Sequence, residues 1–370
     1  MDTLVTLKIN YETKHADLKR NERNFKLLEY FLLKNKLVAN SSEYSQNNPN
    51  DIGHLELFNA LNQTLGEQIR NVIVCSFNSN NLNIINLNTN VLVKTLKGHT
   101  ETIKCFVIYQ LTKVISGSED KSIKIWDLNS SKCLQTLLGH TGVVSSLLLL
   151  KPNLDCLASG SIDKTIKIWS LTNFTCLFTL VCHFGQVLCL DQIKENMHGS
   201  NFLLSGLFNG SIRVWNVLKQ DCVRVIKGHV GGVSCLKVLL DRNLFASGSW
   251  DRLIKIWNVC NGQCVKCLDE LPYSILDLEL LSHSNKLISC SGDLTLRMWD
   301  LNTFSCEIIS TNLVTSLKVS QMSNQENDDM LVCASYYDKS IRVWDLRRGE
   351  CLSKIKTDFE ILKLVFTSIN

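Results

Sequence analysis

The sequence predicts an all-β protein built from a repeated unit of four strands, and three observations lead to this prediction. Six segments similar to SIKIWD each end in a Trp and one polar residue, and the intervals between their Trp residues are 43, 46, 42, 42 and 45 residues. From Asn71 onward, short apolar runs rich in Val, Ile and Leu alternate with Gly, Asn, Asp and Ser, which is typical of strands and turns. A period of this length fits one four-stranded sheet per repeat. The Trp residues are Trp126, Trp169, Trp215, Trp257, Trp299 and Trp344.

Composition and charge narrow the class of protein. The chain has 370 residues, of which 45% are hydrophobic and 20% charged, as in soluble globular proteins. The net charge is +4 and the basic residues form no block, so nucleic acid is not an expected partner. No apolar stretch approaches the roughly 18 residues that cross a membrane, and the first residues lack the order of a secretory signal. We expect a cytosolic or nuclear protein without a membrane partner.

The sequence contains 16 cysteines, and six of them recur seven residues after a repeat Trp. Equivalent positions in successive repeats are too far apart for a disulfide, which needs Cα atoms about 5–6 Å apart. We therefore expect these six to be small apolar core residues in a reducing compartment. They are Cys133, Cys176, Cys222, Cys264, Cys306 and Cys351.

One cysteine cluster could instead hold zinc. Cys260, Cys264 and Cys267 form a CxxxCxxC pattern, but Cys264 is the repeated position and no fourth ligand has finger-like spacing. We therefore predict no metal site and no cofactor.

The repeats share a polar pattern as well as a Trp. In Gly228–Cys264, the clearest copy, a Gly-His pair, a Ser-Gly-Ser, an Asp and the Trp follow in that order. On these motifs, residues 71–370, about four fifths of the chain, resemble the WD-repeat β-propeller family. The resemblance implies that the His, Ser, Asp and Trp of each copy form a hydrogen-bonded structural network. The complete sets are His99, Ser116, Asp120 and Trp126; His140, Ser159, Asp163 and Trp169; and His229, Ser247, Asp251 and Trp257.

A catalytic role for these residues is not expected. Buried polar groups need partners, and no copy of the set differs chemically from the others. We predict neither catalytic residues nor an enzyme.

A seventh, degenerate copy without Trp precedes the six. Alignment on the Gly-His pairs places Ile85 at its Trp position, and it lacks a clear first strand. Ile361–Leu364 reads like the first strands of the other copies, so the C-terminal strand is expected to complete it. The prediction is a seven-bladed WD-repeat β-propeller closed by the C-terminal strand, which removes open sheet edges.

Other copies depart from the pattern. The Trp215 copy has Cys182 in place of Gly and Asn209 in place of Asp, and the Trp299 copy has no Gly-His pair. The Trp344 copy lacks this pair and has Ala334 at the Ser position, so its network should be incomplete. We expect the blades next to the closure to be the loosest.

Residues 1–70 form a separate extension in this prediction. Leu18, Phe25, Leu28 and Leu32 lie along one side of a helix from about Thr13 to Val38. This helix would pack on its own domain or dock to a partner. A polar linker, residues 41–51, follows, and residues 55–69 suggest a second short helix, although Gly53-His54 could open a divergent repeat.

The resemblance also points to a binding surface. In WD-repeat proteins the residue before the turn Asp lies on the narrow face, where peptides commonly bind. Several copies carry large apolar side chains there, and exposed aromatic side chains are typical of interaction sites. We predict a partner site at Trp250, Phe208, Ile162, Tyr337 and Glu119, with local packing between loops as the alternative; Asn78 and Gly292 occupy the same position.

Trp344-Asp345-Leu346-Arg347 fits a box whose Arg, in some WD-repeat proteins, contacts the adaptor of a cullin-RING ubiquitin ligase. The repeats also resemble F-box/WD propellers, but the three prolines, at 49, 152 and 272, leave no F-box Leu-Pro tract near the N-terminus. The expected function is a non-catalytic protein-interaction scaffold, with Arg347 as a ligase-adaptor contact. The alternative is a scaffold in a signalling, trafficking or RNA-processing complex.

Overall fold

The computed structural model describes residues of the unit Gly66–Asn370 only. They are residues 69–76, 79–86, 91–110, 112–150, 155–182, 184–193, 202–239, 243–268, 271–281, 284–310, 314, 316–321, 329–335, 338–346, 350–357 and 361–369. The predicted N-terminal helices and polar linker lie outside the described residues. The first strand of the sheet region begins at Ile69, and Ile69 and Arg70 pair with the C-terminal strand.

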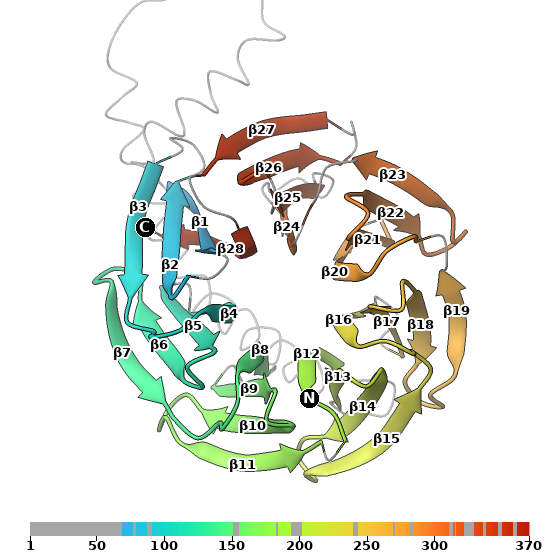
Figure 1. Cartoon of the computed structure of the whole chain (residues 1–370), viewed down its shortest axis with the longest axis horizontal. Helices are drawn as coiled ribbons and strands as arrows, with labels where there is room; N and C mark the ends of the chain where they lie inside the picture. Colours follow the sequence, from blue (N-terminus) through green and yellow to red (C-terminus); the bar gives the residue numbers. More distant parts are fainter. Residues whose placement is uncertain are drawn as a thin grey trace, which may run out of the picture. The chain divides into compact units, whose positions relative to one another are not determined.

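The described residues form seven antiparallel sheets of four strands and contain no helix (Figure 1). The predicted all-β fold of repeated four-stranded sheets is therefore confirmed. We number the sheets 1 to 7 along the ring, and each is given from its inner to its outer strand. Sheet 1 is β28 (Ile361–Ile369), β1 (Ile69–Ser76), β2 (Asn81–Asn86) and β3 (Val91–Lys97); sheet 2 is β4 (Ile103–Tyr109), β5 (Lys113–Ser118), β6 (Ile123–Asp127) and β7 (Lys132–Leu137); sheet 3 is β8 (Val144–Leu150), β9 (Cys156–Ser161), β10 (Thr165–Ser170) and β11 (Cys176–Val181).

The remaining sheets repeat this order. Sheet 4 is β12 (Val187–Ile193), β13 (Phe202–Leu207), β14 (Ser211–Asn216) and β15 (Asp221–Lys227); sheet 5 is β16 (Val233–Val238), β17 (Leu244–Ser249), β18 (Ile254–Asn258) and β19 (Cys264–Leu268); sheet 6 is β20 (Ile275–Leu281), β21 (Lys286–Ser291), β22 (Leu296–Asp300) and β23 (Cys306–Ser310); sheet 7 is β24 (Ser316–Gln321), β25 (Asp329–Ser335), β26 (Ser340–Asp345) and β27 (Glu350–Lys356).

The inner strands arrange the sheets around a common centre (Figure 1). Each inner strand contacts the inner strand of the next sheet, and β28 contacts both β24 and β4. In sheet 1, β28 pairs with β1 from Ile69↔Ile369 to Ser76↔Ile361, with a register shift near Ser76. The two ends of the described region thus meet in one sheet.

The Ser-Gly-Ser of the second strands explains how closely the sheets pack. A Cβ added to Gly117 would lie 2.5 Å from Cγ1 of Val144, the first residue of the next inner strand. Gly160, Gly206 and Gly248 meet the next sheet in the same way. Glycine is required here because only a residue without a side chain allows this approach.

The core lies between neighbouring sheets rather than within one of them. In one buried cluster, Ile115 and Ile123 of sheet 2 pack with Val144 and Trp169 of sheet 3. Similar clusters join the other neighbouring pairs from sheets 1 and 2 to sheets 6 and 7. The inner three strands are therefore covered on both faces, which accounts for their nearly continuous apolar runs.

The prediction that the six recurrent cysteines are core residues is wrong. Each begins, or lies near the start of, an outer strand, where Cys133, Cys176, Cys264 and Cys351 are exposed and Cys222 and Cys306 are partly exposed. An outer strand has a sheet neighbour on one side only, so a recurrent position there need not be buried. The 14 cysteines whose side chains the structure describes form no disulfide.

Candidate functional site

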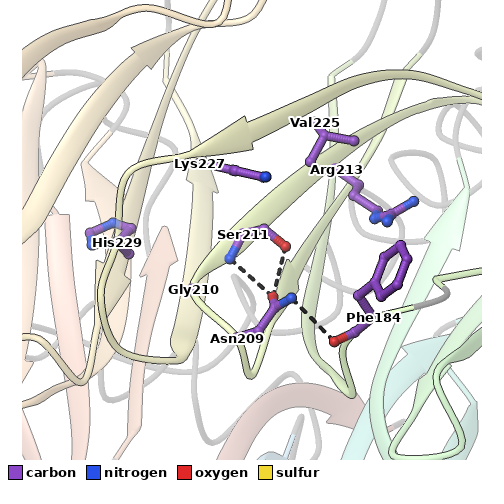
Figure 2. Close-up of a pocket in the computed structure, with 8 residues that line it drawn as sticks. All are labelled: Phe184, Asn209, Gly210, Ser211, Arg213, Val225, Lys227 and His229. Atoms are coloured by element: carbon purple, nitrogen blue, oxygen red, sulfur yellow. Dashed lines mark hydrogen bonds between the residues drawn. The ribbon is translucent and has the colours of Figure 1, made fainter.

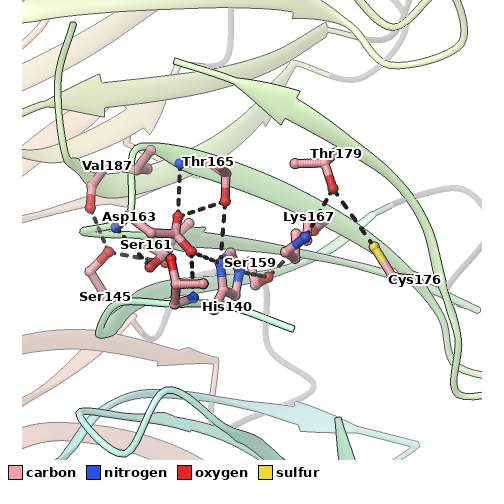
Figure 3. A network of polar contacts seen from close by, with 12 residues as sticks. His140, Ser145, Ser159, Ser161, Asp163, Thr165, Lys167, Cys176, Thr179 and Val187 are labelled. Atoms are coloured by element: carbon pink, nitrogen blue, oxygen red, sulfur yellow. Dashed lines mark hydrogen bonds and ion pairs between the residues drawn. The ribbon is translucent and has the colours of Figure 1, made fainter. Parts of the chain in front are cut away.

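Sheets 2, 3 and 5 contain the same chain of hydrogen bonds. In sheet 3, shown in Figure 3, Nδ1 of His140 lies 2.7 Å from Oδ2 of Asp163, and its Nε2 lies 2.7 Å from Oγ of Ser159. Nε1 of Trp169 donates to the same Oγ at 2.8 Å. The corresponding groups in sheets 2 and 5 lie 2.7–2.8 Å apart, with His99, Ser116, Asp120 and Trp126 in sheet 2 and His229, Ser247, Asp251 and Trp257 in sheet 5.

The protonation states follow from burial and from the direction of these bonds. Burial lowers the pKa of His99, His140 and His229, so each imidazole is neutral at pH 7. Because the indole N–H donates to the Ser oxygen, the Ser O–H can donate to Nε2 and Nδ1–H to the carboxylate. Burial alone would raise the pKa of Asp120, but hydrogen bonds from Ser122 and His99 hold it below its usual value. The network thus ties the turn before each third strand to the loop that enters the sheet.

In sheets 6 and 7 the turn Asp pairs with an Arg of the third strand, whereas in sheets 2, 3 and 5 it pairs with the His. Nη2 of Arg297 lies 3.0 Å from Oδ2 of Asp293, and its Nε donates to Oγ1 of Thr295 at 3.0 Å. In sheet 7, Arg342 pairs with Asp338 in the same manner. These arginines were not predicted as network residues. Their sequence signal is the residue two positions before the Trp: it is Arg in sheets 4, 6 and 7, which read IRVW or LRMW, and Lys in the sheets with a complete network, which read IKIW.

Sheet 7 also differs at its Trp. Nε1 of Trp344 is buried and has no hydrogen-bond partner among the residues that the structure describes. Two features accompany this difference. In the sequence, Ala334 stands where the other Trp-bearing repeats have Ser. In the strand register, Arg342 lies opposite Cys333, whereas Arg297 of sheet 6 lies opposite Ser289.

The turns between second and third strands lie on one face. In sheets 2 to 6, the residue before the turn Asp or its equivalent donates its backbone N–H to the carbonyl just before the inner strand of the same sheet. The distances are 2.8–3.0 Å for Glu119, Ile162, Phe208, Trp250 and Gly292. This common bond places the five positions at the same ends of neighbouring inner strands.

Phe208 of sheet 4 and Trp250 of sheet 5 are in direct contact. Their ring centroids lie 5.4 Å apart in a T-shaped arrangement, while 52% of Phe208 and 43% of Trp250 remain exposed. The Trp250 ring covers Gly232, where an added Cβ would lie 2.9 Å from the ring and 3.2 Å from Leu188. The two aromatic side chains thus combine inter-loop packing with a shared exposed area.

Three more exposed apolar residues lie on loops hydrogen-bonded to these two turns, and for Val230 the bond is from its backbone N–H to Oδ2 of Asp251, next to Trp250. Phe184, Val230 and Tyr273 are exposed, Val230 at 95%. Asn209, next to Phe208, donates to the carbonyl of Phe184, and Ser274, next to Tyr273, donates to the carbonyl of Trp250. We call these five residues, Phe184, Phe208, Val230, Trp250 and Tyr273, the apolar surface. The sequence signal for Val230 was its place directly after the Gly-His pair, where sheets 2 and 3 have Thr.

The other predicted site residues differ in exposure and pairing or are not described. Ile162 is half-buried, and Glu119 forms an ion pair with Lys104 at 2.9 Å, which lowers the pKa of the Glu119 carboxyl. Tyr337, Arg347 and Asn78 lie outside the described residues.

The described residues show neither a metal-binding cluster nor a membrane-spanning helix. Across the described ranges, no group of three or more His, Cys, Asp or Glu side chains is placed to hold a metal. Cys260 of the CxxxCxxC pattern lies 3.7 Å from Oδ1 of Asn243, and Cys264 donates to the carbonyl of Lys266. Within the same ranges, no helix is long and apolar enough to cross a membrane.

Comparison with known families agrees with the repeat pattern. The family model described as "WD domain, G-beta repeat" matches residues 90–127, 131–170, 174–216, 220–258, 262–300 and 302–345. These matches cover more than half of the chain, so it belongs to the WD-repeat family. No curated protein sequence matches the chain. The repeats mark the chain as a protein–protein interaction scaffold, since WD-repeat propellers typically bind other proteins.

Proposed function

We propose that this chain is a non-catalytic scaffold, a closed seven-bladed propeller that holds a partner protein on the apolar surface. The observation that carries the proposal is the exposed contact between Phe208 and Trp250 on neighbouring sheets. Monomeric proteins rarely expose grouped large apolar side chains, and Trp and Tyr are frequent anchors of interfaces. A scaffold function needs a rigid base, and each of these residues stands on a turn hydrogen-bonded to an inner strand or to a neighbouring loop.

The apolar surface favours a partner with an apolar or aromatic anchor. The Trp250 ring packs over Gly232 with 43% of the residue exposed, and 52% of Phe208 beside it is exposed. A peptide or domain that buries Phe208 and Trp250 together would gain most of its affinity there, because hot-spot residues dominate binding energy.

The test compares full-length chains in affinity purification with quantitative mass spectrometry. In the Phe208→Ala/Trp250→Ala variant we expect specific partners to be lost. An interface anchor contributes about 2 kcal/mol or more, so the loss of each anchor should weaken the affinity by about 30-fold or more. Val265→Ala is the matched control, because Val265 is an exposed apolar residue on the outer strand of the same sheet as Trp250. Equal recovery of every partner by the double variant, with an unchanged melting temperature, would contradict the proposal.

A finer proposal assigns the scaffold to a cullin-RING ubiquitin ligase. It is supported by Trp344-Asp345-Leu346-Arg347, since the other Trp-bearing repeats have no Arg at the position of Arg347. Co-purification of a ligase adaptor that is lost in Arg347→Ala supports this assignment. Partners drawn instead from a signalling, trafficking or RNA-processing complex, unaffected by Arg347→Ala, support the alternative scaffold role.

A cytosolic or nuclear location is part of the proposal. The 14 cysteines whose side chains the structure describes, exposed ones included, form no disulfide, and thiols stay reduced in those compartments.

A further inference from the structure

Arg213 in sheet 4 is a buried cation without the partner that its equivalents have. Only 9% of the residue is exposed, and its Nε has no hydrogen-bond partner in the part of the chain that the structure describes. Its equivalents Arg297 and Arg342 each pair with an Asp four residues earlier. At that position sheet 4 has Asn209, a neutral side chain.

Asn209 does not replace the missing carboxylate. Its Oδ1 accepts hydrogen bonds from the backbone N–H and the hydroxyl of Ser211, at 3.2 and 2.7 Å, and its Nδ2 donates to the carbonyl of Phe184. In sheet 6, by contrast, Thr295 at the position of Ser211 accepts from the Arg Nε. The one ring contact of Arg213 is with Trp215, whose centroid lies 5.8 Å from the guanidinium carbon. A buried charge with no counter-ion is costly, so an external anion would be favoured here.

The guanidinium opens onto a cavity of about 290 Å³ (Figure 2). Besides Arg213, the cavity is lined by Lys227, Ser211, Asn209, His229 and Phe184, and none of its lining residues is acidic. Burial lowers the pKa of His229, so this ring is neutral at pH 7 and stays bound to Asp251. Two cationic side chains and a hydroxyl therefore face a space without a negative charge.

The mouth of the cavity is shaped by Gly210. Its φ is +79°, and the equivalent turn positions carry side chains with similar positive φ in the other sheets, such as Lys121 and Arg252. A Cβ at Gly210 would lie 2.3 Å from the carbonyl oxygen of His229. The turn can thus pack on the next sheet only with glycine, which contributes no side chain to the opening.

We propose that the cavity between Arg213 and Lys227 is a binding site for an oxyanion, a phosphate or carboxylate group carried by a ligand or partner. A guanidinium binds both groups through paired N–H donors, and the Lys227 ammonium adds a second charge. Phe184 belongs both to the cavity lining and to the apolar surface, so an acidic or phosphorylated side chain could enter beside a docked partner. The site does not rest on the proposed scaffold function, because a free anion suffices to test it.

The test titrates the intact chain with inorganic phosphate and, separately, with acetate, each against chloride at matched ionic strength. The readout is the ¹H–¹⁵N signal of the Arg213 Nε–H group, assigned by its loss in Arg213→Lys. We expect a saturable shift. Tighter binding of phosphate points to a phosphorylated side chain, and binding of acetate that is equal or tighter points to Asp or Glu.

Asn209→Asp is the decisive variant, because it supplies the internal carboxylate found in sheets 6 and 7 and costs only the hydrogen bond from Asn209 Nδ2 to the carbonyl of Phe184. It should weaken anion binding at least tenfold and shift the Arg213 signal in the absence of added anion. Lys219→Ala, which removes an exposed cation of the same sheet outside the cavity, should bind within twofold of the unaltered chain. A missing or unsaturable shift, or undiminished binding in Asn209→Asp, would overturn the proposal. Trp250→Ala should leave the titration unchanged even if it abolishes partner binding, which separates the two proposals.

Discussion

Single residues determine how each sheet satisfies its buried polar groups. Ser116 serves two of them, since its oxygen lies 2.8 Å from both the His99 and the Trp126 ring nitrogens. Ser289 of sheet 6 accepts from Trp299 at 2.9 Å, and Leu271 stands where sheets 2 to 5 have His. The serine at this position therefore provides a hydrogen-bond partner for two buried rings in sheet 2 but for one in sheet 6.

Removing the hydroxyl should reveal this difference. Ser116→Ala leaves two buried groups without a partner, whereas Ser289→Ala leaves one, and each orphaned group costs about 1–3 kcal/mol. We expect Ser116→Ala to reduce the free energy of unfolding by about 1–3 kcal/mol more than Ser289→Ala does. Calorimetric melting of the two variants measures the gap, and equal losses would show that His99 finds another partner.

The three buried histidines also give the stability a pH dependence. Their folded pKa values are lowered by burial, while an unfolded His has a pKa of about 6.5. Below about pH 6.5 the unfolded chain binds more protons than the folded one, so the free energy of unfolding falls as the pH falls. The lowered pKa values of Asp120, Asp163 and Asp251 add a further loss below about pH 4.

We expect the melting temperature to decrease between pH 7.5 and 5.5, where Asp120, Asp163 and Asp251, with their lowered pKa values, do not titrate. His229→Gln should make this decrease smaller, because one of the three linked groups is gone. A melting temperature that is constant over this range, or a slope unaffected by the substitution, would rule out the histidines as its cause.

Among the elements, β28 joins the C-terminal end of the described region to its first strand. It supplies the inner strand of sheet 1, where Ile361 and Leu364 are fully buried, and it contacts β24 and β4 on either side. Without it, β1 would present an open strand edge at the centre of the molecule.

Truncation after Lys356 tests this element. Loss of Ile361 and Leu364 alone removes burial worth about 1.5–3 kcal/mol each, and the exposed edge of β1 should promote aggregation. We expect a large fall in melting temperature, and partial recovery when a peptide of residues 357–370 is added. A truncated chain that melts like the intact one would show that β28 contributes nothing to the fold.

The elements also show where sequence reasoning succeeds. The Trp period and the Ser-Gly-Ser strands predict repeated four-stranded sheets because a buried strand needs apolar or small residues throughout. The recurrent cysteines misled, because periodicity does not reveal that Cys133 and Cys264 lie on outer strands. The contact of Phe208 with Trp250 joins residues 42 positions apart in the sequence, and only the packing of neighbouring sheets brings them together. The role of Arg213 depends on comparison with the Asp293–Arg297 pair, which the spacing of residues alone did not indicate.

In the whole molecule, polar contacts across the inner strands join successive sheets. Glu279 of sheet 6 forms ion pairs with Lys237 of sheet 5 and Lys318 of sheet 7. Burial alone would raise the pKa of Glu279, but the two lysines hold it below its usual value. Asp191 of sheet 4 accepts from the backbone N–H of Val238 in sheet 5. Polar contacts of this kind also join sheets 2 and 3 and sheets 3 and 4, where Cys105 donates to the carbonyl of Val144 and Ser145 donates to that of Val187.

Local stability should vary around the ring, and we expect sheets 1 and 7 to be the least stable. Sheet 1 has Ile85 at the Trp position, and Trp344 of sheet 7 has a buried N–H without an acceptor among the described residues. Amides in β2–β3 and β26–β27 should exchange at least tenfold faster than those in β17–β19, where the His229 network is complete. Hydrogen exchange followed by mass spectrometry measures these segments separately.

Ser247→Ala should bring exchange in β17–β19 toward that of β26–β27, because it removes the acceptor that sheet 7 already lacks. Uniform protection around the ring, or no change in this variant, would mean that packing between sheets, and not the polar network, sets local stability.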